Sequence, residues 1–349
     1  MKQISTILFF AACFTGLAQQ PYYNSIDLNL KGQELKKELT TLITTTHKKQ
    51  LSYSEVWDAL KVTDLDPTNS TRVIQIYGYN KNSTTSDDAY YNSVNNNGAG
   101  TTQWNREHSY AKSLGTPNLG EAGPGADAHH LRASNVKRNS TRGNSKFANG
   151  SGTSKNVSGG WYPGDEWKGD VARMMMYMYL RYQTRCLPAG VGVGSTSQTS
   201  DGMIDLFLKW NSEDPVSQIE IQRNEYLGNS ANKFAQGNRN PFIDNPYLAT
   251  VIWGGPVAEN KWEKLGTDDN YIEVKNTIKA YTKNNSILIA STDDSVASIQ
   301  IFNSFGQLVR SYDNTRKLKT IELQNFEKGI YIIKINGATY STNKKVIVK

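Results

Sequence analysis

The pattern of apolar residues changes near residue 268, and this change divides the chain into two parts. Before it, apolar residues recur at helical spacing in several segments. After it, alternating strand-like runs follow one another, for example at 286–289 and 329–335. We therefore predict an α+β fold, with a mixed α/β domain over residues 19–268 and a small all-β, sandwich-like domain over residues 269–349. The second part contains no histidine and no cysteine, which makes it a poor place for catalysis.

The first 18 residues are typical of a secretion signal peptide. Lys2 supplies the positive start, an apolar run follows to Leu17, and small residues flank the end of that run. The run is too short to span a membrane, so we expect a secreted protein without stable membrane insertion. Cleavage before Cys13, as in a lipoprotein, is the alternative. Removal of the peptide leaves Cys186 as the single cysteine, so the fold has to form without an intrachain disulfide.

Several segments of the first domain have a clear local pattern. The spacing of apolar residues predicts helices over residues 33–47, 170–182 and 203–210, and a short helix after a capping box of Ser52 and Glu55. The polar residues 220–236 are also expected to be helical. A strand is predicted over residues 73–77, and an exposed polar loop over residues 80–102.

Residues 104–144 combine a carboxylate, three of the four histidines, several basic residues and several side-chain amides. Cutting a phosphodiester needs these groups, because it requires a metal site, a base and cations for a polyanion. Glu107 and Asn139 could supply the carboxylate and amide oxygens that a hard divalent cation prefers. His108 could act as the general base, because an imidazole titrates near neutral pH.

A basic segment overlaps this motif and contains no acidic residue; its members are Arg132, Lys137, Arg138, Arg142 and Lys146. A segment of one sign attracts a phosphate backbone. The formal net charge of +7 also favours an anionic partner such as nucleic acid. A solvated basic face is the alternative when charge is considered alone. We expect Arg106, Arg132, Lys137 and Arg138 to bind nucleic acid.

The pair His129-His130 allows a different interpretation, because three histidines and an acid can bind zinc. The HExxH pattern of zinc peptidases is absent around Glu107. We expect one histidine of the pair to pack inward and support the catalytic site. His129 is the one that we predict to lie closer to it.

Three blocks of sequence resemble the endonuclease I family of secreted, nonspecific nucleases, which belongs to the ββα-metal (His-Me finger) superfamily. They are WNREH at 104–108, DAHHLR at 127–132 continuing to NSTRGN at 139–144, and GNRNPFID at 237–244. The resemblance covers most of residues 20–260. It implies a ββα core with one divalent metal ion, for which Mg²⁺ is expected and Mn²⁺ or Ca²⁺ are the alternatives. It also implies cleavage of DNA, and often of RNA, with little sequence preference. We expect a monomer.

By the family pattern, Glu107 and Asn139 are metal ligands and His108 is the general base. Some members have an arginine between the first two blocks that stabilises the transition state, but residues 109–126 contain none. We therefore assign that role to Arg142.

Two further positions leave alternatives open. Some members have an acidic residue where Gly125 stands, so the proton donor to the leaving group is not assigned. Arg239 in the third block is expected to contact phosphate, and a structural turn packed against the core is an equal alternative.

The C-terminal residues resemble the type IX secretion sorting domain of Bacteroidetes. The matching runs are IQIFNSFGQLV at 299–309, KGIYIIKI at 328–335 and KKVIVK at 344–349. The resemblance implies entry into the periplasm and export across the outer membrane. The type IX secretion machinery is therefore an expected partner.

Three functions compete at this point. The leading one is an extracellular metal-dependent endonuclease. The second is a non-catalytic nucleic-acid-binding surface protein or adhesin, which explains the basic segment without using the acid, base and amide. The third is a zinc hydrolase built on His108, His129 and His130.

Overall fold

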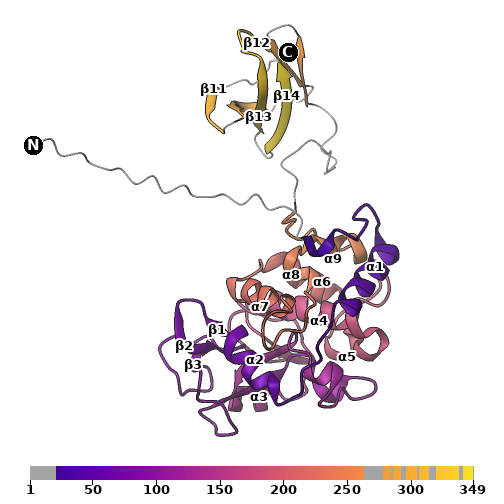
Figure 1. The fold of residues 1–349 in the computed structure, drawn as a ribbon, viewed down its shortest axis with the longest axis vertical. Helices are drawn as coiled ribbons and strands as arrows, with labels where there is room; N and C mark the ends of the chain where they lie inside the picture. The colour runs from indigo at the N-terminus through magenta and orange to yellow at the C-terminus, as the bar shows by residue number, and fades with distance from the viewer. Residues whose placement is uncertain are drawn as a thin grey trace, which may run out of the picture. The chain divides into compact units, whose positions relative to one another are not determined.

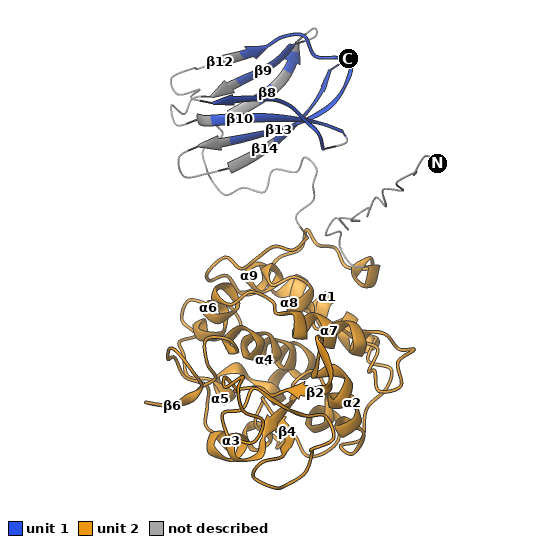
Figure 2. Ribbon diagram, turned by 90° about the vertical axis from the view of Figure 1, so that its left-hand side faces the viewer, with its two compact units in different colours: residues 1–16, 263–349 blue, residues 17–262 orange. Residues whose placement is uncertain are grey.

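The computed structural model describes residues 21–262, 278–283, 286–291, 296–304, 306–313, 320–337 and 341–348. They belong to two compact units, which are considered separately (Figure 1, Figure 2). We call the unit that ends at Trp262, orange in Figure 2, the first unit, and the one that contains the strands from Ile278 onward, blue in Figure 2, the second unit. The predicted signal peptide and the predicted boundary near residue 268 lie outside the described residues.

Helices make up most of the regular structure of the first unit. The α-helices are α1 (Gly32–Thr45), α2 (Glu55–Thr63), α3 (Val136–Arg142), α4 (Lys168–Tyr182), α5 (Pro188–Val191), α6 (Asp205–Glu213), α7 (Gln218–Gly228), α8 (Pro241–Asp244) and α9 (Tyr247–Trp253). The 3₁₀ helices are η1 (Pro21–Tyr23), η2 (Lys112–Leu114), η3 (Gly123–Ala126) and η4 (Gln183–Cys186). The strands are β1 (Leu65–Asp66), β2 (Asn69–Ile74), β3 (Tyr91–Ser93), β4 (Trp104–His108), β5 (Leu131–Asn135), β6 (Lys155–Val157) and β7 (Gly160–Tyr162). They form the sheet β1-β2-β3 and the pairs β4-β5 and β6-β7.

Helix α4 forms the centre of the larger hydrophobic core. Every residue from Gly169 to Leu180 is buried, and the helix contacts α1, α6 and α8. Its methionines, among them Met174 and Met178, fill the spaces between these helices because their unbranched side chains adapt to irregular gaps. The predicted core helix from Asp170 is confirmed.

The first two helices also form where the sequence predicts them. The apolar face of α1, including Leu35 and Leu39, is buried. At the start of α2, Ser52 Oγ accepts a hydrogen bond of 3.2 Å from the Glu55 N–H, and the Glu55 carboxylate accepts one of 2.9 Å from the Ser52 N–H. This capping box satisfies backbone donors that have no partner within the helix.

The chain between β2 and β4 is more ordered than its polar composition indicates. Strand β3 pairs with β2, and Gln75 Nε2 donates a hydrogen bond of 2.9 Å to the Ala89 carbonyl oxygen. Ala89 and Tyr90 are buried. The prediction of an exposed loop over residues 80–102 is therefore wrong for this part, because two apolar side chains and pairing with β2 anchor it.

The central motif folds as two antiparallel strands followed directly by a helix. Strands β4 and β5 pair so that Glu107 lies opposite Arg132. Helix α3 begins immediately after β5, where the Asn135 side chain accepts hydrogen bonds of 2.8 and 3.1 Å from the backbone N–H groups of Lys137 and Arg138. This arrangement agrees with the predicted ββα core and the predicted mixed fold of the first domain (Figure 1).

The second unit is an antiparallel β-sandwich. Its strands are β8 (Ile278–Lys283), β9 (Ser286–Ser291), β10 (Val296–Asn303), β11 (Leu308–Asp313), β12 (Thr320–Leu323), β13 (Gly329–Gly337) and β14 (Ser341–Val348). One sheet has the order β11-β10-β13-β14 and the other β12-β9-β8. Ile287 and Ile289 from the smaller sheet share a core with Ile299, Ile301 and Ile333 from the larger one. The predicted all-β second domain is confirmed.

Candidate active site

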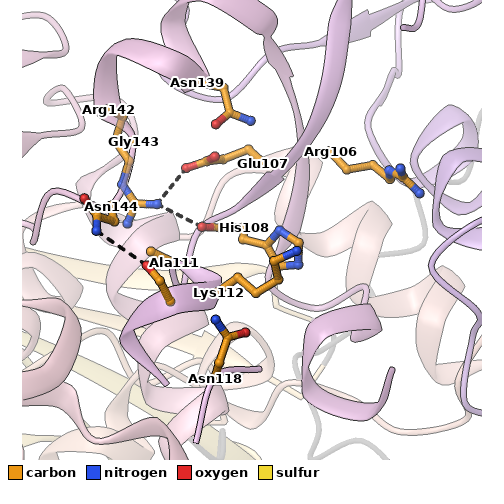
Figure 3. A pocket seen from close by; sticks show the side chains of 11 residues that line it. Arg106, Glu107, His108, Ala111, Lys112, Asn118, Asn139, Arg142, Gly143 and Asn144 are labelled. Carbon is orange, nitrogen blue, oxygen red and sulfur yellow. Dashed lines mark hydrogen bonds and ion pairs between the residues drawn. The ribbon is translucent and has the colours of Figure 1, made fainter. Parts of the chain in front are cut away.

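A cavity of about 260 Å³ opens at the ββα core (Figure 3). Strand β4 contributes Arg106, Glu107 and His108 to its lining, and helix α3 contributes Asn139 and Arg142. The remaining lining residues come from loops and η2, and they are Ala111, Lys112, Ser113, Asn118, Gly143 and Asn144. The residues predicted as general base and as metal ligands therefore line one cavity, because α3 packs against β4.

Glu107 is a buried carboxylate with one oxygen held firmly. Its Oε1 accepts hydrogen bonds of 3.0 Å from the Tyr77 hydroxyl and 3.0 Å from Arg142 Nη1. Burial raises the pKa of Glu107 to about 7, and the Arg142 charge and the Tyr77 hydrogen bond oppose that rise. Within the part of the chain that the structure describes, Oε2 has no hydrogen-bond partner.

Asn139 lies on α3, one turn before Arg142. Its Nδ2 donates a hydrogen bond of 2.8 Å to the side-chain oxygen of Asn105 on β4. This bond determines which end of the amide faces Asn105. The Asn139 side-chain oxygen accepts no hydrogen bond from the described residues, so it is available to a ligand in the cavity.

His108 is oriented by a backbone carbonyl and an aromatic ring. Its Nε2 lies 2.9 Å from the Gly125 carbonyl oxygen, which can only accept, so Nε2 carries the proton and Nδ1 has the lone pair. The imidazole stacks on Tyr53 at 5.5 Å between ring centroids. Burial lowers the pKa of His108 to about 3, and a nearby His130 contributes in the same direction. The imidazole is therefore neutral at neutral pH.

Arg142 is buried beside Glu107 and uses most of its donors within the protein. Besides Glu107, Nη1 donates to the His108 carbonyl oxygen at 2.9 Å, and Nη2 donates to the Ser109 carbonyl oxygen at 2.9 Å. The guanidinium also lies over the Phe147 ring, 4.7 Å from its centroid. These contacts tie the Glu107 carboxylate to the backbone at the end of β4.

The prediction that His129 is the histidine closer to the site is wrong. His130 lies beside His108, with 5.6 Å between ring centroids, and its Nε2 is 2.8 Å from the Pro124 carbonyl oxygen. His129 does not line the cavity, and its Nε2 is 3.0 Å from the Asn238 carbonyl oxygen. The pair occupies the turn into β5, so the two neighbouring side chains point to different surroundings.

Two of the arginines predicted to bind nucleic acid are engaged elsewhere, which corrects those predictions. Arg132 is 1% exposed and forms ion pairs with Asp64 at 2.9 Å and Asp170 at 3.1 Å. Arg239 donates two hydrogen bonds, of 2.7 and 2.6 Å, to the carboxylate of Asp244. The Arg132 guanidinium cannot reach a phosphate without breaking buried ion pairs, and two nitrogens of Arg239 are engaged in a partly buried pair.

The other predicted nucleic-acid contacts have mixed surroundings. Arg138 is 9% exposed and donates to the Asp87 and Ser154 carbonyl oxygens at 3.0 and 3.3 Å. Lys137 is exposed and remains a candidate. Arg106 lines the cavity, but its guanidinium lies over Tyr53, 3.5 Å from the ring centroid, and donates to the Tyr53 carbonyl oxygen.

Sequence reasoning missed several residues that shape the site. Tyr77 holds Glu107 and Tyr53 stacks on His108, and no local pattern marks these tyrosines because they come from other parts of the chain. Asn105, which binds Asn139, stands within the WNREH block, but the motif did not indicate this role. Lys112 also lines the cavity. It could have been noticed, because Lys112 and Glu121 are the only charged residues between positions 109 and 126.

A family model described as Endonuclease I matches residues 31–247, which include every residue of the cavity. The chain belongs to the endonuclease I family. It is therefore a nuclease, that is, a phosphodiester hydrolase, as the sequence motifs predict. Nucleic acid is its substrate class, and nucleases of the endonuclease I family typically use a divalent metal ion.

Two relatives agree with this assignment. An extracellular ribonuclease from Bacillus amyloliquefaciens is 40% identical over 254 residues, which are 70% of this chain and 82% of that protein. An extracellular ribonuclease from Bacillus subtilis (strain 168) is 41% identical over 232 residues, which are 64% of this chain and 75% of that protein. Among solved structures, the sulfur carrier protein SoxY from Chlorobium limicola f thiosulfatophilum matches 21% of this chain and 76% of its own at 19% identity. Its TM-score of 0.15 is too low to indicate a shared fold.

A separate family model matches the second unit. A model described as a secretion system C-terminal sorting domain matches residues 283–349, which confirms the predicted sorting domain and the prediction of a secreted protein. None of the helices in the described residues is long and apolar enough to cross a membrane.

Proposed function

We propose that the chain is a secreted, metal-dependent endonuclease that hydrolyses phosphodiester bonds of DNA and RNA with little sequence specificity. One observation carries this proposal: His108 lines the same cavity as Glu107 and Asn139, and its Nε2 lies 2.9 Å from the Gly125 carbonyl oxygen, which leaves the lone pair on Nδ1. A neutral imidazole can accept a proton from water, and the two oxygen donors can hold a cation that lowers the pKa of that water.

The residues present fit a divalent cation. Glu107 Oε2 and the Asn139 side-chain oxygen are free of partners among the described residues, and both side chains line the cavity. A hard cation such as Mg²⁺ takes one or two such oxygens and completes its coordination with water and phosphate, and Mn²⁺ or Ca²⁺ would accept the same donors. A buried carboxylate whose pKa is raised is also one that a second positive charge would stabilise.

Each residue of the site then has a stated task. His108 accepts a proton from the attacking water at Nδ1, while the bond to Gly125 holds the ring. A bound divalent cation would offset the negative charge that develops on the phosphate. Arg142 keeps Glu107 in place. We propose it as a positioning residue, in place of the role in transition-state stabilisation that the sequence predicted, because its guanidinium is buried and bonded to three protein oxygens. His129 has no task in this scheme.

The substrate is proposed to include RNA as well as DNA. The two relatives named extracellular ribonuclease support RNA. The cavity is lined mainly by polar side chains, among them Asn118 and Asn144. Phosphate contacts without base contacts give little sequence preference.

The zinc alternative finds no support in the geometry. The Nε2 atoms of His108, His129 and His130 lie against three different carbonyl oxygens. Among the described residues no group of three or more histidine, cysteine or acidic side chains is placed to hold a metal ion.

The test uses the full-length protein with supercoiled plasmid and with RNA, in Mg²⁺, Mn²⁺, Ca²⁺ and EDTA. The His108→Ala variant is measured beside it, and His47→Gln serves as control because His47 does not line the cavity. We expect metal-dependent cleavage that His108→Ala lowers by at least about a hundredfold while binding is retained. An intact substrate in every cation, with binding retained, would instead favour the non-catalytic binder.

A further inference from the structure

Lys112 is a cation on the cavity wall that none of the motifs includes. It begins the short helix η2, and in Figure 3 its side chain extends toward the His108 ring. Its ammonium nitrogen lies 3.1 Å from Glu121 Oε1. The two side chains are 38% and 62% exposed, so solvent reaches both partners.

The cavity has two other cations, and both are held by the protein. Arg142 donates to Glu107 and to two carbonyl oxygens. Arg106 lies between the rings of Tyr53 and Trp57, at 3.5 and 4.3 Å from their centroids. Of the three basic side chains that line the cavity, Lys112 is the one whose charge is paired only with an exposed carboxylate.

An exposed ion pair is easily exchanged. Such pairs contribute little to stability, because water screens the charges and both long side chains lose freedom when they pair. A phosphodiester that enters the cavity carries one negative charge, as the Glu121 carboxylate does, and the neighbouring phosphates of the nucleic acid add to the attraction for Lys112. The four-carbon stem of lysine lets the ammonium turn from Glu121 toward a ligand without movement of the backbone.

The backbone around this pair is well anchored. The Leu119 N–H donates to the Lys112 carbonyl oxygen at 3.0 Å, and Arg185 donates to the Asn118 carbonyl oxygen at 2.8 Å. The loop that carries Glu121 continues into Gly125, whose carbonyl oxygen orients His108. Lys112, Glu121 and the orientation of His108 therefore depend on one short loop.

We propose that Lys112 binds a phosphate of the nucleic-acid substrate next to His108, and that Glu121 masks this charge when no substrate is present. The proposal rests on the proposed function. Lys112 contributes a solvent-exposed cation, whereas Arg142 is buried and already bonded to three protein oxygens. Glu121 opposes binding, because it competes with phosphate for the same ammonium group and adds a negative charge at the cavity rim.

The two side chains are therefore expected to have opposite effects on cleavage. With the full-length protein on plasmid and on RNA, Lys112→Gln should lower kcat/KM about tenfold or more, and Lys112→Arg should restore most of it. The slope of log(kcat/KM) against log salt should become shallower by about one in Lys112→Gln. Glu121→Gln should raise kcat/KM about two- to fivefold, which matches the strength of an exposed ion pair.

The double variant Lys112→Gln/Glu121→Gln separates masking from general repulsion. If Glu121 acts through Lys112, Glu121→Gln gives no increase in the Lys112→Gln background. If Glu121→Gln raises kcat/KM equally in the wild-type and the Lys112→Gln backgrounds, Glu121 does not act by masking Lys112. Lys81→Gln and Glu166→Gln are matched controls, because this pair is also exposed, has its charges 3.6 Å apart and lies outside the cavity lining.

Failure of this inference can be distinguished from failure of the proposed function. A wild-type protein that cleaves, an inactive His108→Ala and a Lys112→Gln variant no different from Lys81→Gln would overturn the inference alone. A wild-type protein without cleavage in any cation overturns the proposed function and this inference with it. Thermal unfolding of each variant shows whether it is folded. If Lys112→Gln does not fold, the change in kcat/KM of Glu121→Gln still tests the inference.

Discussion

The carbonyl oxygen of Gly125 lies 2.9 Å from His108 Nε2 and thereby decides which nitrogen of the imidazole carries the proton. Gly125 reaches this position because its backbone packs against that of Gly120. A Cβ atom added to Gly125 would lie 2.0 Å from the Gly120 carbonyl oxygen. The orientation of the proposed base thus depends on the absence of a side chain 17 residues away in the sequence.

The Gly125→Ala variant is expected to fold and to lose activity. The loop has to shift to relieve the contact with Gly120, and a misplacement of about 1 Å at a catalytic group can lower kcat about a hundredfold. Steady-state kinetics and thermal unfolding would measure this. Gly329→Ala is the control, because an added Cβ there has its nearest neighbour at 3.9 Å. Unchanged kcat in Gly125→Ala would show that the Gly125 contact does not orient the base.

Metal binding is expected to stabilise the first unit through Glu107 and Asn139. A cation present at a hundred times its Kd should raise the free energy of unfolding by about 2.7 kcal/mol. Glu107→Gln and Asn139→Leu should abolish most of that increase, because the first removes the negative charge of the carboxylate ligand and the second removes the amide oxygen ligand. Urea unfolding with and without Mg²⁺ measures it independently of activity. Glu166→Gln is the control, and an equal increase in all the variants would place the metal elsewhere.

Arg132 is expected to matter for stability rather than for nucleic-acid binding. Arg132→Met leaves the buried Asp170 without its ion pair to β5 and should lower the free energy of unfolding by about 3–5 kcal/mol. The salt dependence of DNA binding should not change. Lys137→Met, at an exposed position, should leave stability within about 0.5 kcal/mol. A shallower salt slope with unchanged stability in Arg132→Met would restore the original prediction of a phosphate contact.

Acid is expected to destabilise the protein through His129. Burial lowers the pKa of His129 to about 4 from 6.5, so between these values the unfolded chain binds more protons than the folded one. The contribution of the neutral His129 to the free energy of unfolding is fully present above pH 6.5 and is lost as the pH falls toward 4. At the acid end the loss approaches about 3 kcal/mol.

A variant isolates this effect from other groups. Burial raises the pKa of Asp214 to about 6, which acts in the opposite direction over the same range, so the wild type alone is not informative. The difference in free energy of unfolding between wild type and His129→Gln should shrink as the pH is lowered from 7 to 4. If the difference in free energy of unfolding stays constant across that range, His129 is not the source of the destabilisation by acid.

The resemblance to the family, and not a local pattern of apolar residues, predicted the two strands and the helix of the site. The strands β4 and β5 and helix α3 follow one another along a short stretch of chain, and Asn135 caps the helix directly after β5. Such short-range preferences act between neighbouring residues. The convergence of Glu107, His108 and Asn139 on one cavity therefore follows from the sequence motif together with the pairing of adjacent elements.

Long-range packing decided which charges are available. Arg132 and Arg142 look alike in a basic segment, yet Arg132 is paired with Asp64, 68 residues earlier, and with Asp170, 38 residues later. No local pattern in the sequence indicates that Arg132 will contact either of these distant carboxylates. The same holds for the contact between Gly125 and His108.

The motifs were enough to predict the family, its ββα unit and the donors Glu107, His108 and Asn139. Tertiary contacts were needed to show that His130 lies beside His108, that Arg132 is held in buried ion pairs and that Lys112 remains exposed. The difference arises because the identity of a side chain determines only which partners it can bind. Its burial and its partners depend on elements far away in the chain, and these determine what it does bind.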